Sequence, residues 1–323
     1  MCSSLNPSQA LNWLGLAWKA ASAKYLNACC ASAGNLSVLP IQCFSLRLVT
    51  FILVNSFVII ETFVQTSTPC GLCLGVSMEK IAVITGASGG LGQALAKKLL
   101  AEHWQLILVS RDAEKLKSIY GNAHTHIIAD CSSVAGAKQI FDDATSKNLL
   151  PNALAHCVGN IRLGAMHRMQ EADFIDCMSS NLFSAFHTLA AFTYHLKHTS
   201  MAGSAVLVSS AAARIGTPNH EAIAAAKGGL EAMVRGAAAT YASANIRINS
   251  VAPGILDTAA SANILSSELM REMAAKQYPL KGIGNVDDVA DLMAWLLSEH
   301  ATRVTGQVWS MDAGFSAIRP LVK

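Results

Sequence analysis

A glycine-rich turn between an apolar strand and a helix constrains the fold of this chain more than any other feature. The apolar residues Ile81 to Ile84 run directly into TGASGGLG, Thr85 to Gly92. An unbroken apolar run bounded by glycines is typical of a strand buried on both faces. Leu91, Leu95 and Leu99 then recur every fourth residue, as on the apolar face of a helix. This order of elements predicts a nucleotide-binding turn, although an ordinary glycine-rich connection is the alternative.

The pattern of the turn favours a dinucleotide. Gly86 can form the tight turn, and Gly90 and Gly92 let the backbone approach a phosphate. The helix that follows offers free N–H groups and the positive end of its dipole. A P-loop would close with Gly-Lys-Ser/Thr, whereas Leu91, Gly92 and Gln93 follow Gly90 here. The expected ligand is therefore not ATP or GTP.

From Met78 onward, apolar strand-like runs alternate with helical stretches, without internal repeats or low-complexity linkers. This alternation predicts an α/β fold: a single doubly wound, Rossmann-type parallel sheet of about seven strands, flanked by helices, over residues 78–323. After the first strand and helix, the expected strands are 106–109, 127–129, 154–156, 205–208, 246–251 and 307–311, and the expected helices lie near 132–147, 171–198, 221–243 and 287–298.

Residues 1–77 have a different composition and are expected to form a non-globular N-terminal extension. They hold only three of the 24 basic and one of the 21 acidic side chains, but six of the nine cysteines. Because Met78 stands just before the first strand, the leading interpretation is an artefactual upstream start. A targeting or membrane-anchoring leader is the alternative. The apolar stretch within 48–64 is short for a spanning helix, which needs about 20 apolar residues.

The remaining charges are nearly balanced, which argues against a nucleic acid or an anionic membrane as a partner. Cys131, Cys157 and Cys177 show no pairing pattern, which predicts a reducing compartment. The expected location is the cytoplasm, or an organelle or membrane if residues 1–77 are a genuine leader. Cys70 and Cys73 form a single CxxC without a partner pair, so no metal site is predicted.

The TGxxxGxG pattern from Thr85 to Gly92 resembles the short-chain dehydrogenase/reductase family, and further matches follow in family order through nearly all of 78–323. They are similar to the family's adenine-site aspartate, active-site asparagine, catalytic serine, motif lysine and nicotinamide loop. In this sequence those positions are Asp130, Asn181, Ser210, Lys227 and Pro253-Gly254. The similarity is greatest to members resembling 3-oxoacyl-carrier-protein reductases.

The resemblance implies an NAD(P)(H)-dependent oxidoreductase that interconverts carbonyl and alcohol groups. It also implies a small, partly apolar substrate and a homo-dimer or homo-tetramer. The segment from Thr258 to Tyr278 resembles the family's mobile substrate lid. The implied cofactor contacts are Gly86, Ser88, Gly89, Gly90, Leu91, Gly92, Arg111, Asp130, Cys131, Gly159, Lys227, Pro253 and Gly254.

The implied catalytic residues have roles that their chemistry supports. Lys227 can hydrogen-bond a ribose, and its ammonium lowers the pKa of a nearby acid. Ser210 can stabilise charge on a carbonyl oxygen, and Asn181 is expected to hold a water in a proton relay. Without the family register, Ser210 would be interpreted as a strand-end serine capping a turn, and Lys227 as a solvated helix lysine.

The end of the second strand predicts which dinucleotide is bound. An acidic residue there favours NAD, whereas a nearby arginine accommodates the 2′-phosphate of NADP. Ser110 stands where the acid would be, and Arg111 follows it. NADP(H) is therefore expected rather than NAD(H), unless Arg111 simply pairs with Asp112.

The sequence departs from the family at the proton donor, a tyrosine four residues before the lysine. Ile223 occupies that position. A second departure is His156-Cys157-Val158-Gly159, where the family has Asn-Asn-Ala-Gly. Isoleucine cannot donate a proton, so another group must act in a carbonyl reductase. His220 is the first candidate, because in a helix it would share a face with Ile223 and Lys227; Glu221 is a weaker one.

Two further interpretations of the missing tyrosine stay open. In one, Ser210, Lys227 and water share the proton work around a hydride transfer. In the other, the chain is a non-catalytic NADP(H)-binding partner or sensor that pairs with an active homologue.

Overall fold

The computed structural model describes residues 53–54, 57–58 and 79–319. The chain divides into two units, Met1–Ser77 and Met78–Lys323, which are treated separately. In the first, β1 (Leu53–Val54) and β2 (Phe57–Val58) form an antiparallel pair. The rest of the expected extension, including most of 48–64, lies outside the described residues. Among the described residues, none belongs to a helix that is both long and apolar enough to cross a bilayer.

The second unit is built on a seven-stranded sheet in the order β5-β4-β3-β6-β7-β8-β9, with every neighbouring pair parallel. The doubly wound α/β prediction is confirmed. Each expected strand is present, although the third starts earlier than expected and ends before Ala129. The strands are β3 (Ile81–Thr85), β4 (Gln105–Ser110), β5 (Thr125–Ile128), β6 (Ala153–His156), β7 (Gly203–Val208), β8 (Ile246–Pro253) and β9 (Val308–Met311).

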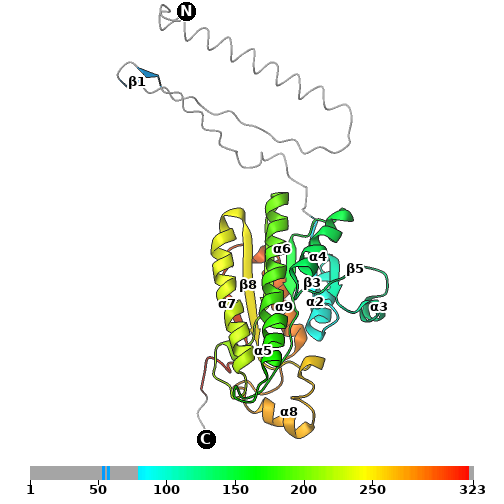
Figure 1. The fold of residues 1–323 in the computed structure, drawn as a ribbon, viewed down its shortest axis with the longest axis vertical. Helices are drawn as coiled ribbons and strands as arrows, with labels where there is room; N and C mark the ends of the chain where they lie inside the picture. Colours follow the sequence, from blue (N-terminus) through cyan, green and yellow to red (C-terminus); the bar gives the residue numbers. More distant parts are fainter. Residues whose placement is uncertain (1–52, 55–56, 59–78, 320–323) are drawn as a thin grey trace, which may run out of the picture. The chain divides into compact units, whose positions relative to one another are not determined.

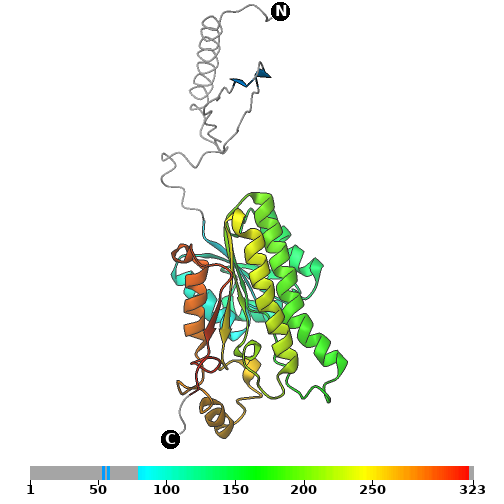
Figure 2. The same ribbon diagram turned by 90° about the vertical axis from the view of Figure 1, so that its left-hand side faces the viewer.

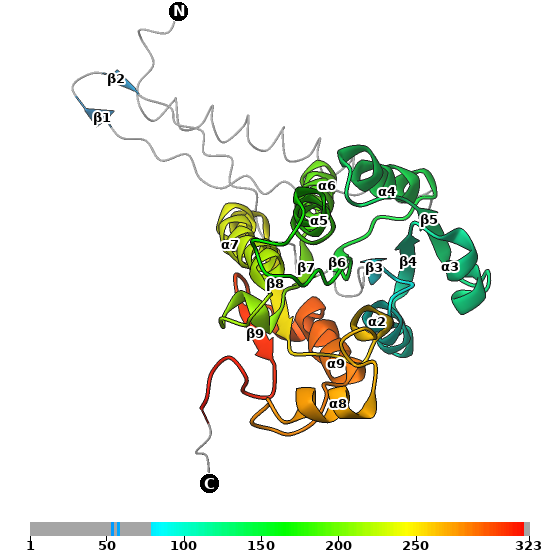
Figure 3. The same ribbon diagram turned by 60° about the horizontal axis from the view of Figure 1, so that its bottom comes forward.

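Helices cover both faces of the sheet (Figures 1, 2 and 3). One layer holds α4 (Val134–Ser146), α6 (Ser184–Thr199) and α7 (Glu221–Tyr241), and the opposite layer holds α2 (Gly90–Ala101) and α9 (Val286–Leu297). Each layer packs on its own apolar cluster, because successive side chains of the buried strands point to opposite faces. Three eight-residue helices complete the unit: α3 (Ala113–Tyr120), α5 (Glu171–Met178) and α8 (Glu268–Ala275).

The helix expected over 171–198 is interrupted, which corrects that prediction. A π-helical turn, η2 (Ser179–Phe183), separates α5 from α6. Side chains satisfy carbonyls around this wider turn: Asn181 Nδ2 donates to Cys177 O at 2.9 Å, and Ser184 Oγ donates to Ser180 O at 2.7 Å. Such bulges occur often at functional sites, and this one carries Asn181.

The sheet's connections change direction between β3 and β6. In open α/β sheets, ligands bind at such a point, in the crevice outside the carboxyl ends of the strands. Thr85, the last residue of β3, is in register with His156, the last residue of β6. The glycine turn, the loop after β6, Ser210 after β7 and the end of β8 therefore meet at one edge of the sheet.

Candidate active site

The glycine turn has the geometry of an anion-binding site. Gly86 adopts a positive φ of 71°, and its carbonyl accepts a hydrogen bond from Gly89 N at 2.9 Å. Helix α2 begins at Gly90, and Gly89 caps it without any side-chain hydrogen bond from the described residues. The first N–H groups of α2 are thus free to bind a phosphate.

Gly92 has a packing role that the sequence did not predict. A Cβ atom there would lie 2.4 Å from Gly86 O and 2.9 Å from Ala87 Cα, and the residue is buried. The turn itself requires this glycine, because helix and strand approach closely there. At Gly90, a Cβ would lie 3.1 Å from Thr258 Cγ2. Thr258 therefore lies over the start of α2, and sequence reasoning missed it as a site residue because only its place after Pro253-Gly254 pointed there.

The end of β4 leaves Arg111 available. Ser110 Oγ lies 3.0 Å from Ser88 Oγ, which ties this strand end to the glycine turn. Asp112 Oδ1 accepts from Lys115 N at 2.9 Å and caps α3. Arg111 is exposed and forms no ion pair within 79–319, so the expected alternative, a pair between Arg111 and Asp112, is absent from that range.

The loop after β5 places Asp130 at the surface and Cys131 in the core. Asp130 Oδ1 accepts from Ser132 N at 3.0 Å and from Ser132 Oγ at 2.8 Å, and these bonds lower the pKa of Asp130. The Cys131 side chain is 4% exposed, and burial raises its pKa to about 11. Cys131 can therefore offer a ligand only its backbone.

Asn181 and Lys227 converge beside Gly159. A Cβ on Gly159 would lie 2.6 Å from Asn181 Oδ1 and 3.4 Å from Lys227 Nζ, which limits the separation of those two atoms to 6.0 Å. Asn181 Nδ2 donates to Asn160 O, at 3.1 Å, and to Cys177 O. Asn181 Oδ1 is buried without a hydrogen-bond partner among the described residues. A water or a ligand at this place would satisfy the acceptor.

Lys227 is a buried ammonium rather than a solvated helix lysine. It exposes 5% of its surface, and Nζ donates to Val208 O at 2.8 Å. Burial lowers the pKa of Lys227 to about 8, while Cys177 and Cys157 act weakly in the opposite direction. No carboxylate in the described range pairs with it, so the lysine can gain or lose a proton near neutral pH.

Ser210 follows the last residues of β7 and begins a 3-10 turn at Ala211–Ala213. Its Oγ accepts from Ala212 N at 3.2 Å, so it does cap a turn, but its own hydrogen remains free to donate. The neighbouring Ser209 Oγ donates to the buried Glu231 at 2.8 Å, and Arg214 pairs with the same carboxylate at 3.2 Å. This network fixes the end of β7 against α7.

Ile223 lies one turn before Lys227 and is 5% exposed. It packs in a small apolar cluster with Cys177 and Ala222, bordered by Met169 and Ala212. The position of the expected proton donor is thus an apolar wall.

His220 lies outside the helix that was expected to align it with Ile223. It is the N-cap residue of α7, with φ −107° and ψ 14°, and α7 begins at Glu221. Its Nδ1 lies 2.7 Å from Pro218 O, so Nδ1 carries a hydrogen and points back into the preceding loop. The argument from a shared helical face is therefore wrong for His220.

The end of β8 is held by the expected lid. Tyr278 Oη accepts from Ile255 N at 2.8 Å, and the Tyr278 ring lies 2.8 Å from where a Gly254 Cβ would be. Phe315 packs against the same ring, with centroids 5.1 Å apart. Tyr278 and Phe315 therefore fix the segment after Pro253.

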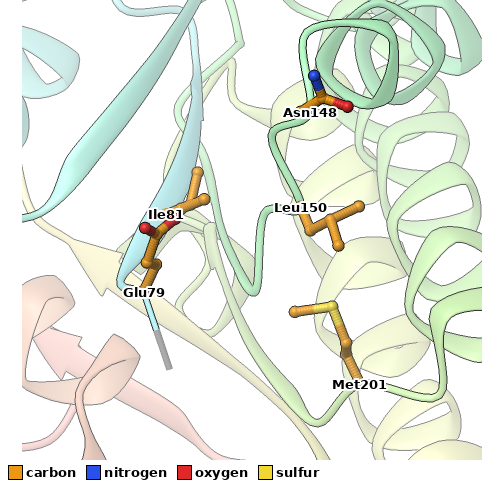
Figure 4. A pocket seen from close by; sticks show the side chains of 5 residues that line it. All are labelled: Glu79, Ile81, Asn148, Leu150 and Met201. Atoms are coloured by element: carbon orange, nitrogen blue, oxygen red, sulfur yellow. The ribbon is translucent and has the colours of Figure 1, made fainter. Parts of the chain in front are cut away.

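A separate hollow lies at the opposite edge of the sheet (Figure 4). It is bordered by Ile81, which begins β3, by Met201, which precedes β7, and by Glu79, Asn148 and Leu150. Because these residues lie at the amino ends of the strands, the hollow is distinct from the crevice described above.

Comparisons with known proteins agree with this geometry. A family model described as enoyl-(acyl carrier protein) reductase matches residues 86–316. A tropinone reductase homologue of Arabidopsis thaliana is 30% identical over 245 residues, covering 73% of this chain and 92% of that protein. Cis-4-hydroxycyclohexanecarboxylate dehydrogenase of Sinomonas cyclohexanicum is 30% identical over 249 residues, which cover 74% of this chain and 98% of that protein. The structure of levodione reductase superposes with a TM-score of 0.69 at 27% identity, covering 74% of this chain and 98% of that one.

The chain belongs to the short-chain dehydrogenase/reductase family of oxidoreductases.

Proposed function

We propose that this protein is an NADP(H)-dependent oxidoreductase that interconverts carbonyl and alcohol groups through an active site without the family tyrosine. The convergence of Asn181 Oδ1 and Lys227 Nζ beside Gly159 carries the proposal. The names of the relatives, dehydrogenases and reductases, support the same reaction class.

The residues at the crevice fit a dinucleotide. The uncapped start of α2 would bind the diphosphate, and Arg111 the 2′-phosphate. Lys227 would hydrogen-bond the nicotinamide ribose. The remaining contacts would come from Ser88, Asp130, the backbone of Cys131, Gly159, Pro253 and Gly254, with Thr258 over Gly90. When bound, NADP(H) supplies or accepts the hydride.

Side chains of the protein would stabilise the charge that develops on the substrate and supply the proton. Because Asn181 Oδ1 and Lys227 Nζ lie no more than 6.0 Å apart, one water could bridge them through two hydrogen bonds of about 2.8 Å each. Lys227 can donate to that water, and the water can donate to Asn181. The free O–H of Ser210 would stabilise the developing charge on the substrate oxygen. The final proton would come from this water, from Lys227 or from His220.

A second function is favoured by the packing of Ile223. Because this side chain is buried against Cys177 and Ala222, no acid occupies the usual donor position. General acid catalysis is typically worth about two to four orders of magnitude in rate. A non-catalytic NADP(H)-binding partner or sensor, paired with an active homologue, would retain the crevice without needing that group.

The substrate and partners are proposed from exposed apolar side chains. Leu269, Met270 and Met273 are exposed on α8 in the lid, which suits a small, partly apolar substrate. A homo-dimer or homo-tetramer would cover the apolar residues exposed on α5, η2 and α6. The three free cysteines of the described range, Cys131, Cys157 and Cys177, suit a cytoplasmic location.

A panel of ketones and enones with NADPH tests the two functions, using wild type, Ile223→Tyr and His220→Ala. Turnover by the wild-type protein supports the oxidoreductase function. Its loss in His220→Ala would identify His220 as the donor, and unchanged turnover would exclude it. If wild type binds NADPH but is silent while Ile223→Tyr gains turnover, the binding function is correct.

A further inference from the structure

His156 is a buried polar residue that the site described above does not use. It stands where the family has asparagine, at the end of β6, and is 1% exposed. In the sheet register it lies beside Thr85, the last residue of the neighbouring strand β3. A buried imidazole is costly unless both ring nitrogens find partners, so its contacts require an explanation.

Both ring nitrogens have a partner. Nδ1 lies 2.9 Å from Thr85 Oγ1, and Nε2 lies 3.2 Å from Ser184 Oγ. Ser184 has a single hydroxyl hydrogen, which it donates to Ser180 O at 2.7 Å. Toward His156 it must therefore accept, so Nε2 carries the ring hydrogen and Nδ1 accepts from Thr85. The hydrogen bonds run in one direction from Thr85 through His156 and Ser184 to Ser180.

The two ends of this chain of bonds are parts of the candidate active site. Thr85 is the first residue of the glycine motif and directly precedes Gly86. Ser180 lies in the π-helical turn and directly precedes Asn181. The neutral imidazole is the link, because burial and the charge of Lys227 lower the pKa of His156 to about 3.

We infer that His156 is a positioning residue that fixes the turn carrying Asn181 relative to the dinucleotide-binding turn. Its importance for cofactor binding rests on the proposed function, whereas the mechanical link does not. Thr85 Oγ1 lies 3.5 Å from Ala155 O but only 2.9 Å from His156 Nδ1, so its hydrogen is donated to the ring. Losing this hydroxyl at one end therefore weakens the order at the other.

Hydrogen exchange tests the link without any cofactor. Thr85→Val removes one hydroxyl at nearly constant volume, and we expect amide exchange at 181–184 to accelerate about 3- to 10-fold, the effect of one net hydrogen bond. Thr193→Val is the matched control. Thr193 is a buried threonine like Thr85, but it lies on α6 and its hydroxyl bonds only to carbonyls of that helix. Faster exchange confined to β3 and the glycine turn would overturn the inference.

Two further measurements keep the test decisive. Nitrogen NMR should show His156 protonated at Nε2 and without titration between about pH 5 and 8; protonation at Nδ1 would contradict the assigned direction. In a His156→Leu background, Thr85→Val should cause no additional change in amide exchange at 181–184. An undiminished effect of Thr85→Val in that background would contradict the link. If His156→Leu does not fold, the exchange comparison in the wild-type background still decides.

NADPH titration separates this inference from the proposed function. With wild type binding NADPH, Ser184→Ala should raise the Kd about 3- to 10-fold, although Ser184 lies beyond His156 from the glycine turn. Absence of binding by wild type would refute the proposed function but leave the exchange result valid. Tight wild-type binding that Ser184→Ala does not change would refute the extension of the link to the cofactor.

Discussion

Ile223 and Lys227 lie one helical turn apart on α7, and each exposes only 5% of its surface. The same helix face thus carries a buried apolar side chain and, one turn later, a buried ammonium. In the family pattern a tyrosine would stand at the first position, and the lysine would lower its pKa. Here Lys227 has no such acid on the preceding turn, and within residues 79–319 its ammonium donates to the carbonyl oxygen of Val208 at 2.8 Å.

The first prediction concerns pH-dependent stability. The pKa of Lys227 is lowered by burial from 10.5 to about 8, so folding releases a proton between those values. The unfolded chain binds more protons in that window, and stability therefore rises as pH increases from about 8 to 10.5. Below pH 8 the buried charge costs about 3 kcal/mol.

Replacing the charge should relieve this cost. We expect Lys227→Met to be more stable than wild type at pH 7 by about 1–3 kcal/mol, since part of the gain is offset by the lost bond to Val208. The advantage should shrink as pH approaches 10.5. Urea unfolding across pH measures it. The exposed Lys97→Met is the control, and an equal pH profile for both variants would contradict the buried-charge interpretation.

The second prediction concerns the wall formed by Ile223. Ile223→Tyr and Ile223→Phe both enlarge a buried side chain against Cys177 and Met169, so both should lose about 1–3 kcal/mol of stability. Only the tyrosine adds a proton donor one turn before Lys227. We expect carbonyl reduction by Ile223→Tyr to exceed that of Ile223→Phe by about 100-fold or more. Equal rates for these matched variants would show that a hydroxyl there does not reach the reacting oxygen.

The third prediction concerns cofactor choice. Arg111 is exposed and free of ion pairs within 79–319, while Asp112 is occupied as a helix cap. Arg111→Ala should weaken NADPH binding about 10- to 100-fold, as expected for bonds to a charged group, and leave NADH binding nearly unchanged. Fluorescence titration with both nucleotides measures this, with Lys115→Ala as a neighbouring basic control. Tighter binding of NADH than NADPH by wild type would overturn the assignment of NADP(H).

The fourth prediction concerns the network behind Ser210. Glu231 is 6% exposed and accepts from both Ser209 and Arg214. Glu231→Ala leaves two donors without their acceptor and should lower the free energy of unfolding by about 2–4 kcal/mol. Glu231→Gln keeps an acceptor for Ser209 and should lose less. Chemical denaturation compares the two variants, and equal losses would mean that the bond to Ser209 contributes little.

The sequence was sufficient to predict the sheet, because its strands are continuous apolar runs and the glycine turn marks the first crossover. It did not predict the π-helical turn at Asn181. That turn depends on side-chain bonds from Asn181 and Ser184 to carbonyls, which leave no mark on apolar periodicity. The expected start of the helix at residue 221 is confirmed, but His220 is only its N-cap residue, so the condition for a shared helical face with Ile223 and Lys227 is not met.

Residues joined only in three dimensions were also beyond prediction. Thr258 reaches Gly90 from a segment more than 150 residues away, and neither residue type signals the contact. Lys227 could not be recognised as buried, because alanines and glycines around it give α7 no clear polar face. The resemblance to the family indicated that Lys227 is important, and the structure shows that it is buried and has no carboxylate partner within residues 79–319.

The most direct test of the central claim is a titration of the wild-type protein with NADPH, followed by the nucleotide's fluorescence. We expect saturable binding, tighter than that of NADH, and a loss of affinity in Lys227→Met that Lys97→Met does not share. Absence of saturable NADPH binding by the folded wild-type protein would contradict the claim that this crevice is a dinucleotide site.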